Sequence, residues 1–279
     1  MIFKNISDLR HHLIEQSTST LCLVPTMGAL HDGHLSIIKD AIADCHVVVV
    51  SIFVNPTQFN DPNDLSNYPR TLEEDVDKIN QLDGNVLIYS PSVEEVYPHG
   101  VVSDTFDFGS LSKYMEGHYR GGHFDGVGTV LKRLFQLVKP NKAYFGKKDY
   151  QQFAIVKKLV DIEYLNIEVI GCETYRESNG LAKSSRNKLL SKDEKQQAEI
   201  LYTCLKWAKD NFLKVEPLEM KKKVKSIFTS KENFKLEYFE IASENDLEPV
   251  VRLKKGKRYR AFIAAYCSGV RLIDNIALN

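Results

Sequence analysis

Short apolar runs alternate with segments of helical periodicity along the first 175 residues of the chain. The run at 47–54 is rich in β-branched side chains and shows no polar alternation, which is typical of a strand covered on both faces. Strands are predicted at 21–24, 47–54, 86–89, 143–146 and 167–170, and helices at 35–43, 71–82, 126–138 and 150–165. Because such alternation favours right-handed crossovers, we expect an α/β fold with a Rossmann-like parallel sheet flanked by helices.

The pattern changes after the Ser-Asn-Gly sequence at 178–180. Helices are then predicted at 191–211 and 218–228, and strands at 235–242 and 258–273. We therefore expect two domains, a Rossmann-like domain at 1–178 and a smaller C-terminal α+β lid domain at 179–279. Residues 55–70 contain three prolines and four asparagines and are predicted to form a long loop, which in compact domains is usually functional or disordered.

Composition excludes several classes of protein. The chain carries 37 basic and 37 acidic side chains, without the positive excess of a protein that wraps nucleic acid. The longest apolar run, 47–54, is far shorter than the ~20 residues of a membrane-spanning helix, and the N-terminus has no signal-peptide core. The five cysteines are odd in number and widely spaced, so we expect reduced thiols in a soluble cytoplasmic protein.

The two parts of the chain carry opposite net charges. Residues 1–180 hold 16 basic and 24 acidic side chains, a net of −8, and residues 181–279 hold 21 and 13, a net of +8. One interpretation is two solvated surfaces of different composition. Another is a basic C-terminal part that faces an anionic ligand held by the N-terminal part. RNA binding through the basic residues between 221 and 260 is a third, although no interleaved aromatics or binding module support it.

The sequence PTMGALHDGH at 25–34 lies between the first predicted strand and the first predicted helix. Glycines there let backbone N–H groups approach an anion, and the helix N-terminus adds a positive dipole. His31 and His34 share the first helical turn and can both donate to phosphate oxygens. A metal site would need a third ligand from elsewhere in the chain, so the position favours phosphate. The chain lacks G-x-G-x-x-G after this strand and any P-loop motif, which disfavours a dehydrogenase or a P-loop NTPase.

The sequence HDGH at 31–34 resembles the H-x-G-H signature of nucleotidyltransferases, a superfamily that includes class I aminoacyl-tRNA synthetases. The longer string at 25–34 resembles a narrower family, the pantothenate synthetases. Further segments match that family in the expected order: FVNPTQF at 53–59, YPRT at 68–71, GHFDGV at 122–127, GKKDYQQ at 146–152, SSRN at 184–187 and RLIDN at 271–275. The SSRN segment is similar to the mobile K-M-S-K-S phosphate loop of the superfamily.

The resemblance implies ATP-dependent ligation of (R)-pantoate and β-alanine to pantothenate through a pantoyl adenylate, with release of AMP and diphosphate. Attack on the α-phosphorus builds negative charge on phosphate oxygens, so such catalysis needs positioning and fixed positive charge more than a strong base. His34, His31, Lys148 and Arg186 are the implied catalytic residues. The implied ATP-binding residues are Met27, Gly28, Ala29, Leu30, His31, Asp32, Gly33, His34, Gly146, Lys147, Lys148, Asp149, Tyr175, Lys183, Ser184, Ser185 and Arg186.

The resemblance also implies a set of substrate ligands. Gln58 and Gln152 match the family's pantoate ligands, and a neutral amide can bond a hydroxyl and a carboxylate without tying the nucleophile into a salt bridge. Asn55, Arg120 and His123 are further implied ligands of pantoate or β-alanine.

Mg²⁺ is expected on the ATP, with Asp75 the best carboxylate match and Glu74 beside it. Both carboxylates fit equally well as partners of a helix N-terminal dipole. The family is typically dimeric, so a homodimer is expected, and apolar, strand-like residues at 101–108 are a weak independent hint. Another H-x-G-H nucleotidyltransferase remains an alternative, whereas a tRNA synthetase is disfavoured because the C-terminal part leaves no room for an anticodon-binding domain.

Three positions depart from the family pattern. Lys147 stands where an acidic residue is common, and Lys183 stands where Met or Leu usually precedes the first serine. Tyr175 occupies a position where a small aliphatic residue is expected near the adenine. These departures leave every residue regarded as indispensable in place.

Overall fold

The computed structural model describes residues 1–15, 20–59 and 62–279, which divide into two compact units. Unit 1 comprises Met1–Phe108, Arg120–Lys147 and Gln152–Glu173. Unit 2 comprises Gly109–Tyr119, Lys148–Gln151 and Thr174–Asn279. The sequence pattern predicts one boundary at 178/179, whereas unit 2 of the structure also includes the two internal segments 109–119 and 148–151.

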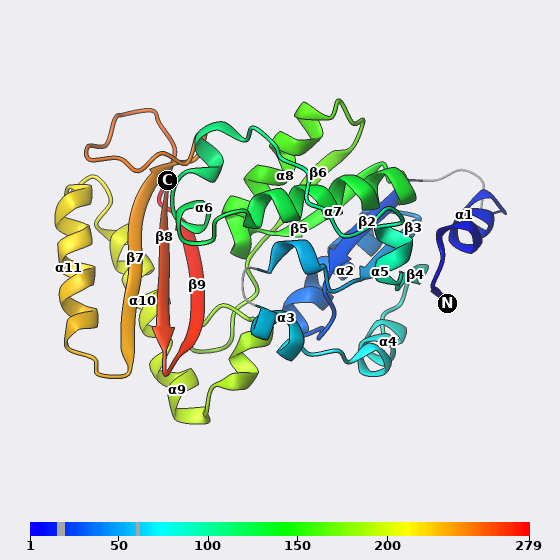
Figure 1. The fold of residues 1–279 in the computed structure, drawn as a ribbon. Coiled ribbons are helices and arrows are strands. Elements are labelled where there is room, and N and C mark those ends of the chain that lie inside the picture. The colour runs from blue at the N-terminus through cyan, green and yellow to red at the C-terminus, as the bar shows by residue number, and fades with distance from the viewer. Residues whose placement is uncertain (16–19, 60–61) are drawn as a thin grey trace. The chain divides into compact units, whose positions relative to one another are not determined.

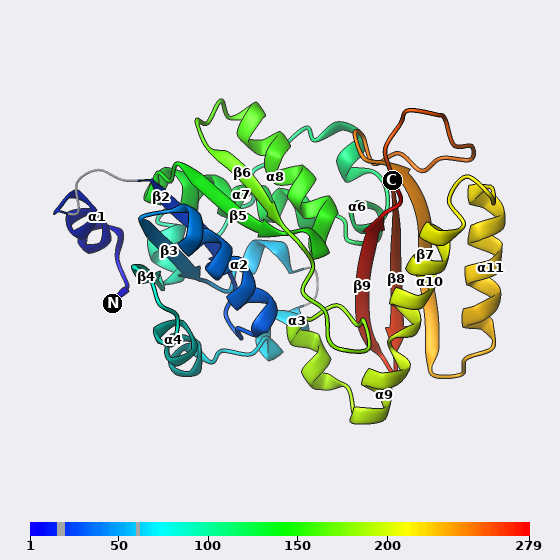
Figure 2. The same cartoon turned by 180° about the vertical axis from the view of Figure 1, so that it is seen from behind.

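Unit 1 contains a parallel sheet whose six described strands lie in the order β1-β4-β3-β2-β5-β6. The strands are β1 (Ile2–Phe3), β2 (Leu21–Thr26), β3 (Val47–Ile52), β4 (Val86–Tyr89), β5 (Lys142–Gly146) and β6 (Glu168–Cys172). Helices cover both faces: α7 (His123–Val138) lies in front of the sheet in Figure 1, and α2 (Asp32–Asp44) lies in front of it in the opposite view of Figure 2. The predicted α/β fold class is confirmed.

The sheet places a ligand-binding edge near β2. This strand pairs with β3 on one side and β5 on the other, so the chain order reverses there. In open parallel sheets, ligands bind beyond the carboxyl ends of the strands at such a reversal. The segments that leave this edge are the β2–α2 loop and the residues that follow Gly146. All six residues of β3 are buried, as the unalternated apolar run predicts.

The remaining helices of unit 1 are short, and two of them correct the prediction of a loop at 55–70. That segment contains the 3₁₀ turn η1 (Pro56–Gln58) and α3 (Pro62–Asn67), both beginning at a proline, whose fixed φ suits a first helical position. Residues 60 and 61 lie outside the described residues. The other helices are α1 (Ile6–Glu15), α4 (Leu72–Asn80), α5 (Val93–Val96) and α8 (Tyr150–Ile162), the last beginning in unit 2.

The strand-like residues at 101–108 form no strand, and Val101 and Val102 are exposed. Among the described residues, no helix is both long and apolar enough to cross a lipid bilayer.

Unit 2 contains an antiparallel sheet in the order β7-β8-β9, covered by helices. Its strands are β7 (Phe234–Ser243), β8 (Tyr259–Cys267) and β9 (Val270–Ala277). The stretch predicted at 258–273 is a hairpin, because Ser268 and Gly269 both adopt positive φ and form a tight turn. The helix predicted at 191–211 is two helices, α9 (Lys192–Gln197) and α10 (Ile200–Asp210). The short helix α6 (Glu116–Tyr119) and the 3₁₀ turn η2 (Gly109–Ser112) lie in the internal segment 109–119.

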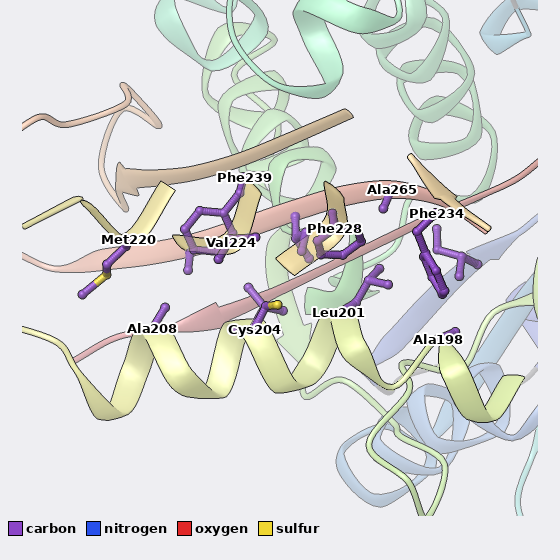
Figure 3. Close-up of a cluster of buried hydrophobic side chains, with 14 of the residues drawn as sticks. Ala198, Leu201, Cys204, Ala208, Met220, Val224, Phe228, Phe234, Phe239 and Ala265 are labelled. Carbon is purple, nitrogen blue, oxygen red and sulfur yellow. The ribbon is translucent and has the colours of Figure 1, made fainter. Parts of the chain in front are cut away.

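The core of unit 2 lies between its sheet and two amphipathic helices. α10 packs on β8 and β9, and α11 (Pro217–Thr229) packs on β7. Leu201, Cys204 and Ala208 recur at helical spacing on one face of α10, and Figure 3 shows them among the buried side chains of α11 and the strands. The α+β class predicted for this part of the chain is confirmed.

The expectation that all cysteines are reduced is wrong for one pair. Cys22 and Cys45 form a disulfide, and their Cα atoms lie 6.1 Å apart. Cys22 is on β2, and Cys45 lies between α2 and the neighbouring strand β3, so the crossover returns the chain to Cys22 after 23 residues. Cys172, Cys204 and Cys267 are free and buried, as expected.

Candidate active site

The β2–α2 loop turns sharply at Gly28 and Ala29, whose φ values are 82° and 51°. A Cβ atom at Gly28 would lie 3.1 Å from both Asp75 Oδ2 and Ile52 Cγ2. Only glycine therefore combines the left-handed backbone with this close approach. The loop residues Gly28, Ala29 and Leu30 are buried, so the turn forms part of the core of unit 1 as well as the edge of the sheet.

Asp75 on α4 binds the backbone of the β2–α2 loop. Its Oδ2 accepts a hydrogen bond of 2.8 Å from the backbone N–H of Ala29, and its Oδ1 accepts one of 2.7 Å from Leu30. Lys78, one turn later, donates to the carbonyl of Leu30 at 3.0 Å. The Asp75 side chain is fully buried, and both of its oxygens are engaged. The geometry therefore does not fit the sequence-based assignment of Asp75 as a Mg²⁺ ligand.

His31 and His34 stack at the start of α2, with ring centroids 4.0 Å apart. His31 is the N-cap, and its Nδ1 accepts from the N–H of Gly33 at 3.1 Å. Nδ1 of His34 accepts in turn from the N–H of His31 at 3.3 Å. A neutral imidazole that accepts at Nδ1 carries its proton on Nε2. Both rings thus present an N–H donor at a helix N-terminus, which suits an anion.

A buried asparagine links the next strand end to α7. Asn55 is 1% exposed; its Nδ2 donates to the carbonyl of Gly126 at 3.1 Å and to Oε1 of Gln58 at 3.2 Å. Its Oδ1 accepts from the Tyr97 hydroxyl, and burial raises the pKa of Tyr97, so this donor stays protonated. Gln58 Nε2 lies 2.9 Å from the Met27 sulfur. Gln58 therefore contacts the β2–α2 loop, and Asn55 is connected to that loop through Gln58.

His123 and Arg120 join the same cluster. His123 is 4% exposed, and its Nδ1 contacts the backbone carbonyl of Gln58 at 3.0 Å. Because a carbonyl only accepts, Nδ1 carries the proton and Nε2 accepts from the Arg120 guanidinium at 2.9 Å. The structure thus brings Met27, Asn55, Gln58, Arg120 and His123 together in unit 1.

The end of β5 supplies Gly146 and Lys147. A Cβ at Gly146 would lie 3.1 Å from the Ile37 side chain of α2, so glycine permits the close packing of strand and helix. Lys147 forms an ion pair of 2.5 Å with Glu173. This pair accounts for a lysine at a position where the family commonly has an acidic residue. Gln152 is half-buried on α8, and Asp32 is exposed at the first position of α2.

Lys148 and Asp149 belong to unit 2. Lys148 Nζ lies 3.3 Å from Asp149 Oδ1, and the lysine side chain is only 19% exposed. The backbone carbonyl of Lys148 accepts a hydrogen bond of 2.7 Å from Asn275 on β9. Asn275 lies in the family-like segment RLIDN, and the sequence predicts no role for it.

The last five predicted site residues lie on a narrow loop and a helical turn of unit 2. Arg176 and Ala182 form an isolated antiparallel bridge, and the N–H of Lys183 donates to the Tyr175 carbonyl at 2.9 Å. Ser184 caps η4 (Ser185–Leu189) by accepting from the N–H of Arg186 at 3.3 Å. Tyr175 is 44% exposed, and Lys183 lies 3.7 Å from Glu177.

The sequence does not predict a partly buried ion network in unit 2. Arg271 on β9 forms two hydrogen bonds with Glu116, of 2.9 and 2.6 Å, and also binds Glu237. The Tyr238 hydroxyl donates to Glu116 at 2.8 Å. Burial alone would lower the pKa of Arg271, but its bonds to the two carboxylates raise it above the ordinary value. No spacing signal connects residue 116 with residue 271, so sequence alone could not pair them.

Several charges of the basic C-terminal region are neutralised locally. Lys221 pairs with Glu240, and Lys222 lies 2.8 Å from Glu219. Arg260 binds Glu244 at 2.9 Å. These pairs weaken the interpretation of residues 221–260 as a nucleic-acid surface.

No group of three or more His, Cys, Asp or Glu side chains that could hold a metal ion occurs within residues 1–15, 20–59 and 62–279. Asp75 is bound to the loop and Glu74 is exposed beside Lys78, so in the part of the chain that the structure describes neither carboxylate is arranged as a Mg²⁺ ligand.

Comparisons with known proteins identify a family for the chain. The family described as pantoate-beta-alanine ligase matches residues 1–277. The chain is 48% identical to a pantothenate synthetase of Flavobacterium psychrophilum over 100% of this chain and 99% of the relative. It is similar to the crystal structure of the pantothenate synthetase of Thermus thermophilus, with a TM-score of 0.91, 36% identity and 99% of both chains covered.

A third similar protein was solved with ligands. The pantoate-beta-alanine ligase of Francisella tularensis, complexed with beta-gamma ATP and beta-alanine, matches with a TM-score of 0.78 and 37% identity. The match covers 100% of this chain and 97% of that one.

Proposed function

Because the chain belongs to the pantoate-beta-alanine ligase family and ligates pantoate and β-alanine with ATP, we propose that it does so in two steps through a pantoyl adenylate. In the first step a pantoate carboxylate oxygen bonds to the α-phosphorus of ATP, and the bond to the β-phosphate oxygen breaks. Diphosphate leaves with its electron pair. In the second step the β-alanine amine attacks the acyl carbon, loses a proton and expels AMP.

The observation that supports this proposal is the pair of Nε2–H donors on His31 and His34. Both rings are fixed by backbone hydrogen bonds at the start of α2, beyond the carboxyl end of β2. Preorganised donors at a helix N-terminus stabilise charge on phosphate oxygens without rearranging during the reaction. We assign His34 and His31 to the phosphates of ATP, and residues 27–34 to its binding loop.

The cluster of Asn55, Gln58, Arg120 and His123 is proposed to bind pantoate, together with Gln152. Gln58 reaches the β2–α2 loop through Met27, which favours placing the pantoate carboxylate beside the loop that holds ATP. Amide groups can orient a carboxylate nucleophile without neutralising it, whereas an ion pair would lower its nucleophilicity. The ordered hydrogen bonds of Asn55 and His123 limit side-chain motion in this cluster.

Lys148 and Arg186 are proposed to supply fixed positive charge. Lys148 is assigned to the α- and β-phosphates and Arg186, with Ser184 and Ser185, to the departing diphosphate. Arg186 offers a planar fork of donors suited to phosphate oxygens. Gly146, Lys147, Asp149, Tyr175 and Lys183 are assigned to ATP binding as well. Mg²⁺ is proposed to accompany ATP as a partner of its phosphates.

A homodimer is also proposed, from the family resemblance alone, and a cytoplasmic location is proposed from the composition of the chain. The mass in solution, measured by light scattering during size-exclusion chromatography, tests the dimer.

Diphosphate release tests the two-step reaction. With ATP and pantoate alone, we expect a burst of about one equivalent of diphosphate per active site. Adding β-alanine should convert the burst to continuous release, with AMP formed at the same rate. Release that requires β-alanine from the first turnover would overturn the adenylate route while leaving the ligase activity intact.

A further inference from the structure

Asn275 binds the main chain of the proposed catalytic lysine across 127 residues of sequence. Its Nδ2 donates to the Lys148 carbonyl at 2.7 Å, and Asn275 is 3% exposed. Both residues belong to unit 2, although residues 148–151 are flanked on both sides by unit 1 in the sequence. The hydrogen bond therefore ties a short excursion of the chain to β9.

The orientation of the Asn275 amide is determined by its other partner. Arg260 donates to Oδ1 of Asn275 at 2.6 Å, so Nδ2 is the atom that faces Lys148. Arg260 is itself held by Glu244, at 3.0 Å from Nε, and its guanidinium lies 3.8 Å above the ring of Tyr150. Tyr150 follows Lys148 closely in sequence, so both ends of this short segment contact the same arginine–asparagine pair.

Asp274, the residue before Asn275, holds β9 in place. Asp274 is bound by Arg176 through two hydrogen bonds of 2.6 and 3.0 Å, and it accepts from the N–H of Asn275 at 2.7 Å. Burial raises the pKa of Asp274, opposed by its bonds to Arg176. The donor that faces Lys148 is thus anchored from both its side chain and its main chain.

We propose that Asn275 is a positioning residue for Lys148, and that Arg260 orients Asn275 for this task. A lysine side chain is long and flexible, so its ammonium can be placed only if its own backbone is fixed. Misplacement of a reacting group by about 1 Å can cost about 10²-fold in rate. The inference rests on the proposed role of Lys148 in adenylate formation.

Asn275→Asp tests the inference with almost no change in volume. The carboxylate still accepts from Arg260 but faces the Lys148 carbonyl with an acceptor. We expect single-turnover adenylate formation to slow by about 10²-fold. Hydrogen exchange of the amides at 147–151 should rise. Asn279→Asp is the matched control, because Asn279 also donates to a carbonyl, that of Lys257, at 2.7 Å and accepts from the N–H of Tyr259.

A double-mutant cycle separates positioning from general structural damage. If Asn275 acts through Lys148, Asn275→Asp should add no further rate loss in a Lys148→Ala background. A full additional loss there, or an unchanged rate in Asn275→Asp alone, would overturn the inference. Near-normal adenylate formation in Lys148→Ala would instead overturn the proposed role of the lysine. If Asn275→Asp does not fold, Asn275→Ala is put through the same cycle, since it removes the donor without burying a charge.

Discussion

Asp75 Oδ2 accepts a hydrogen bond of 2.8 Å from the backbone N–H of Ala29, a loop residue with φ of 51°. The second carboxylate oxygen binds the next N–H along the loop. A residue that resembles a magnesium ligand in sequence is therefore a brace for the proposed ATP loop in the structure.

Asp75→Asn should disturb this loop without changing the requirement for Mg²⁺. An amide retains one acceptor, and its NH₂ group opposes one of the two N–H donors, at a cost of about 1–3 kcal/mol in the free energy of unfolding. We expect the KM for ATP to rise, while the Mg²⁺ concentration for half-maximal activity at saturating ATP stays unchanged. Glu74→Gln, at the exposed neighbouring position, is the control. A large shift in the Mg²⁺ requirement of Asp75→Asn alone would restore the ligand assignment.

The two nitrogen positions of His34 can be tested separately. Asn places an amide near Nδ1, which accepts from His31, whereas Gln extends an N–H donor toward the Nε2 position. We expect His34→Asn to reduce pantoate-dependent diphosphate release by about 10²–10³-fold and His34→Gln to reduce it less, because a lost preorganised donor costs that much. Asn retaining the higher activity would contradict the assignment of Nε2 to phosphate.

The buried network around Arg271 should dominate the electrostatic contribution to stability in unit 2. Arg271→Met leaves Glu116 and Glu237 without their partner, so we expect a loss of about 3–5 kcal/mol in the free energy of unfolding. Lys222→Met removes the exposed pair with Glu219 and should cost less than about 1 kcal/mol. Urea denaturation of both variants measures the difference, and equal losses would refute the prediction.

Alkaline pH should destabilise the protein partly through Cys204. Burial raises the pKa of this thiol to about 11. The unfolded chain releases the thiol proton at lower pH than the folded chain, so the stabilisation is complete below pH ~9 and is lost as pH rises toward ~11. Between about pH 8 and pH 10.5 the wild type should lose about 2 kcal/mol more than Cys204→Ala. Parallel losses in urea denaturation would show that the thiol does not contribute.

The disulfide predicts a definite thiol count. Titration of the unfolded, unreduced protein should find three thiols, and reduction should raise the count to five. The variant with both Cys22→Ser and Cys45→Ser should unfold at lower urea, since closing a loop of this length stabilises by about 3 kcal/mol. Five thiols before reduction would refute the pairing.

Sequence patterns predicted best what depends on local periodicity. β4 was predicted at its observed bounds, and β3 was identified from its unalternated apolar run. The sequence pattern predicts one stretch at 258–273 where the structure has the hairpin of β8 and β9, although the Ser-Gly pair at 268–269 is a turn signal that could have divided it. The reversal of chain order at β2 could not be predicted, because periodicity identifies strands but does not show which strands pair with one another.

In the candidate site, too, local sequence patterns could be recognised and long-range contacts could not. The loop at 27–34 could be identified as an anion-binding element because its glycines and histidines lie next to each other in sequence. Tyr97, Asp75 and Asn275 act through contacts with residues 42, 46 and 127 positions away. Such long-range hydrogen bonds leave no trace in a single sequence, which is why Asp75 was assigned to a metal and Asn275 to no task.

The two units are discontinuous in sequence, and this limits how the enzyme can be divided into fragments. The chain passes between them at 108/109, 119/120, 147/148, 151/152 and 173/174. A fragment that starts at residue 179 would lack Glu116, the buried partner of Arg271, and the Lys148 carbonyl that Asn275 binds. Because each unit is built from several separate segments of the chain, neither unit can be exchanged as a module by gene fusion or truncation.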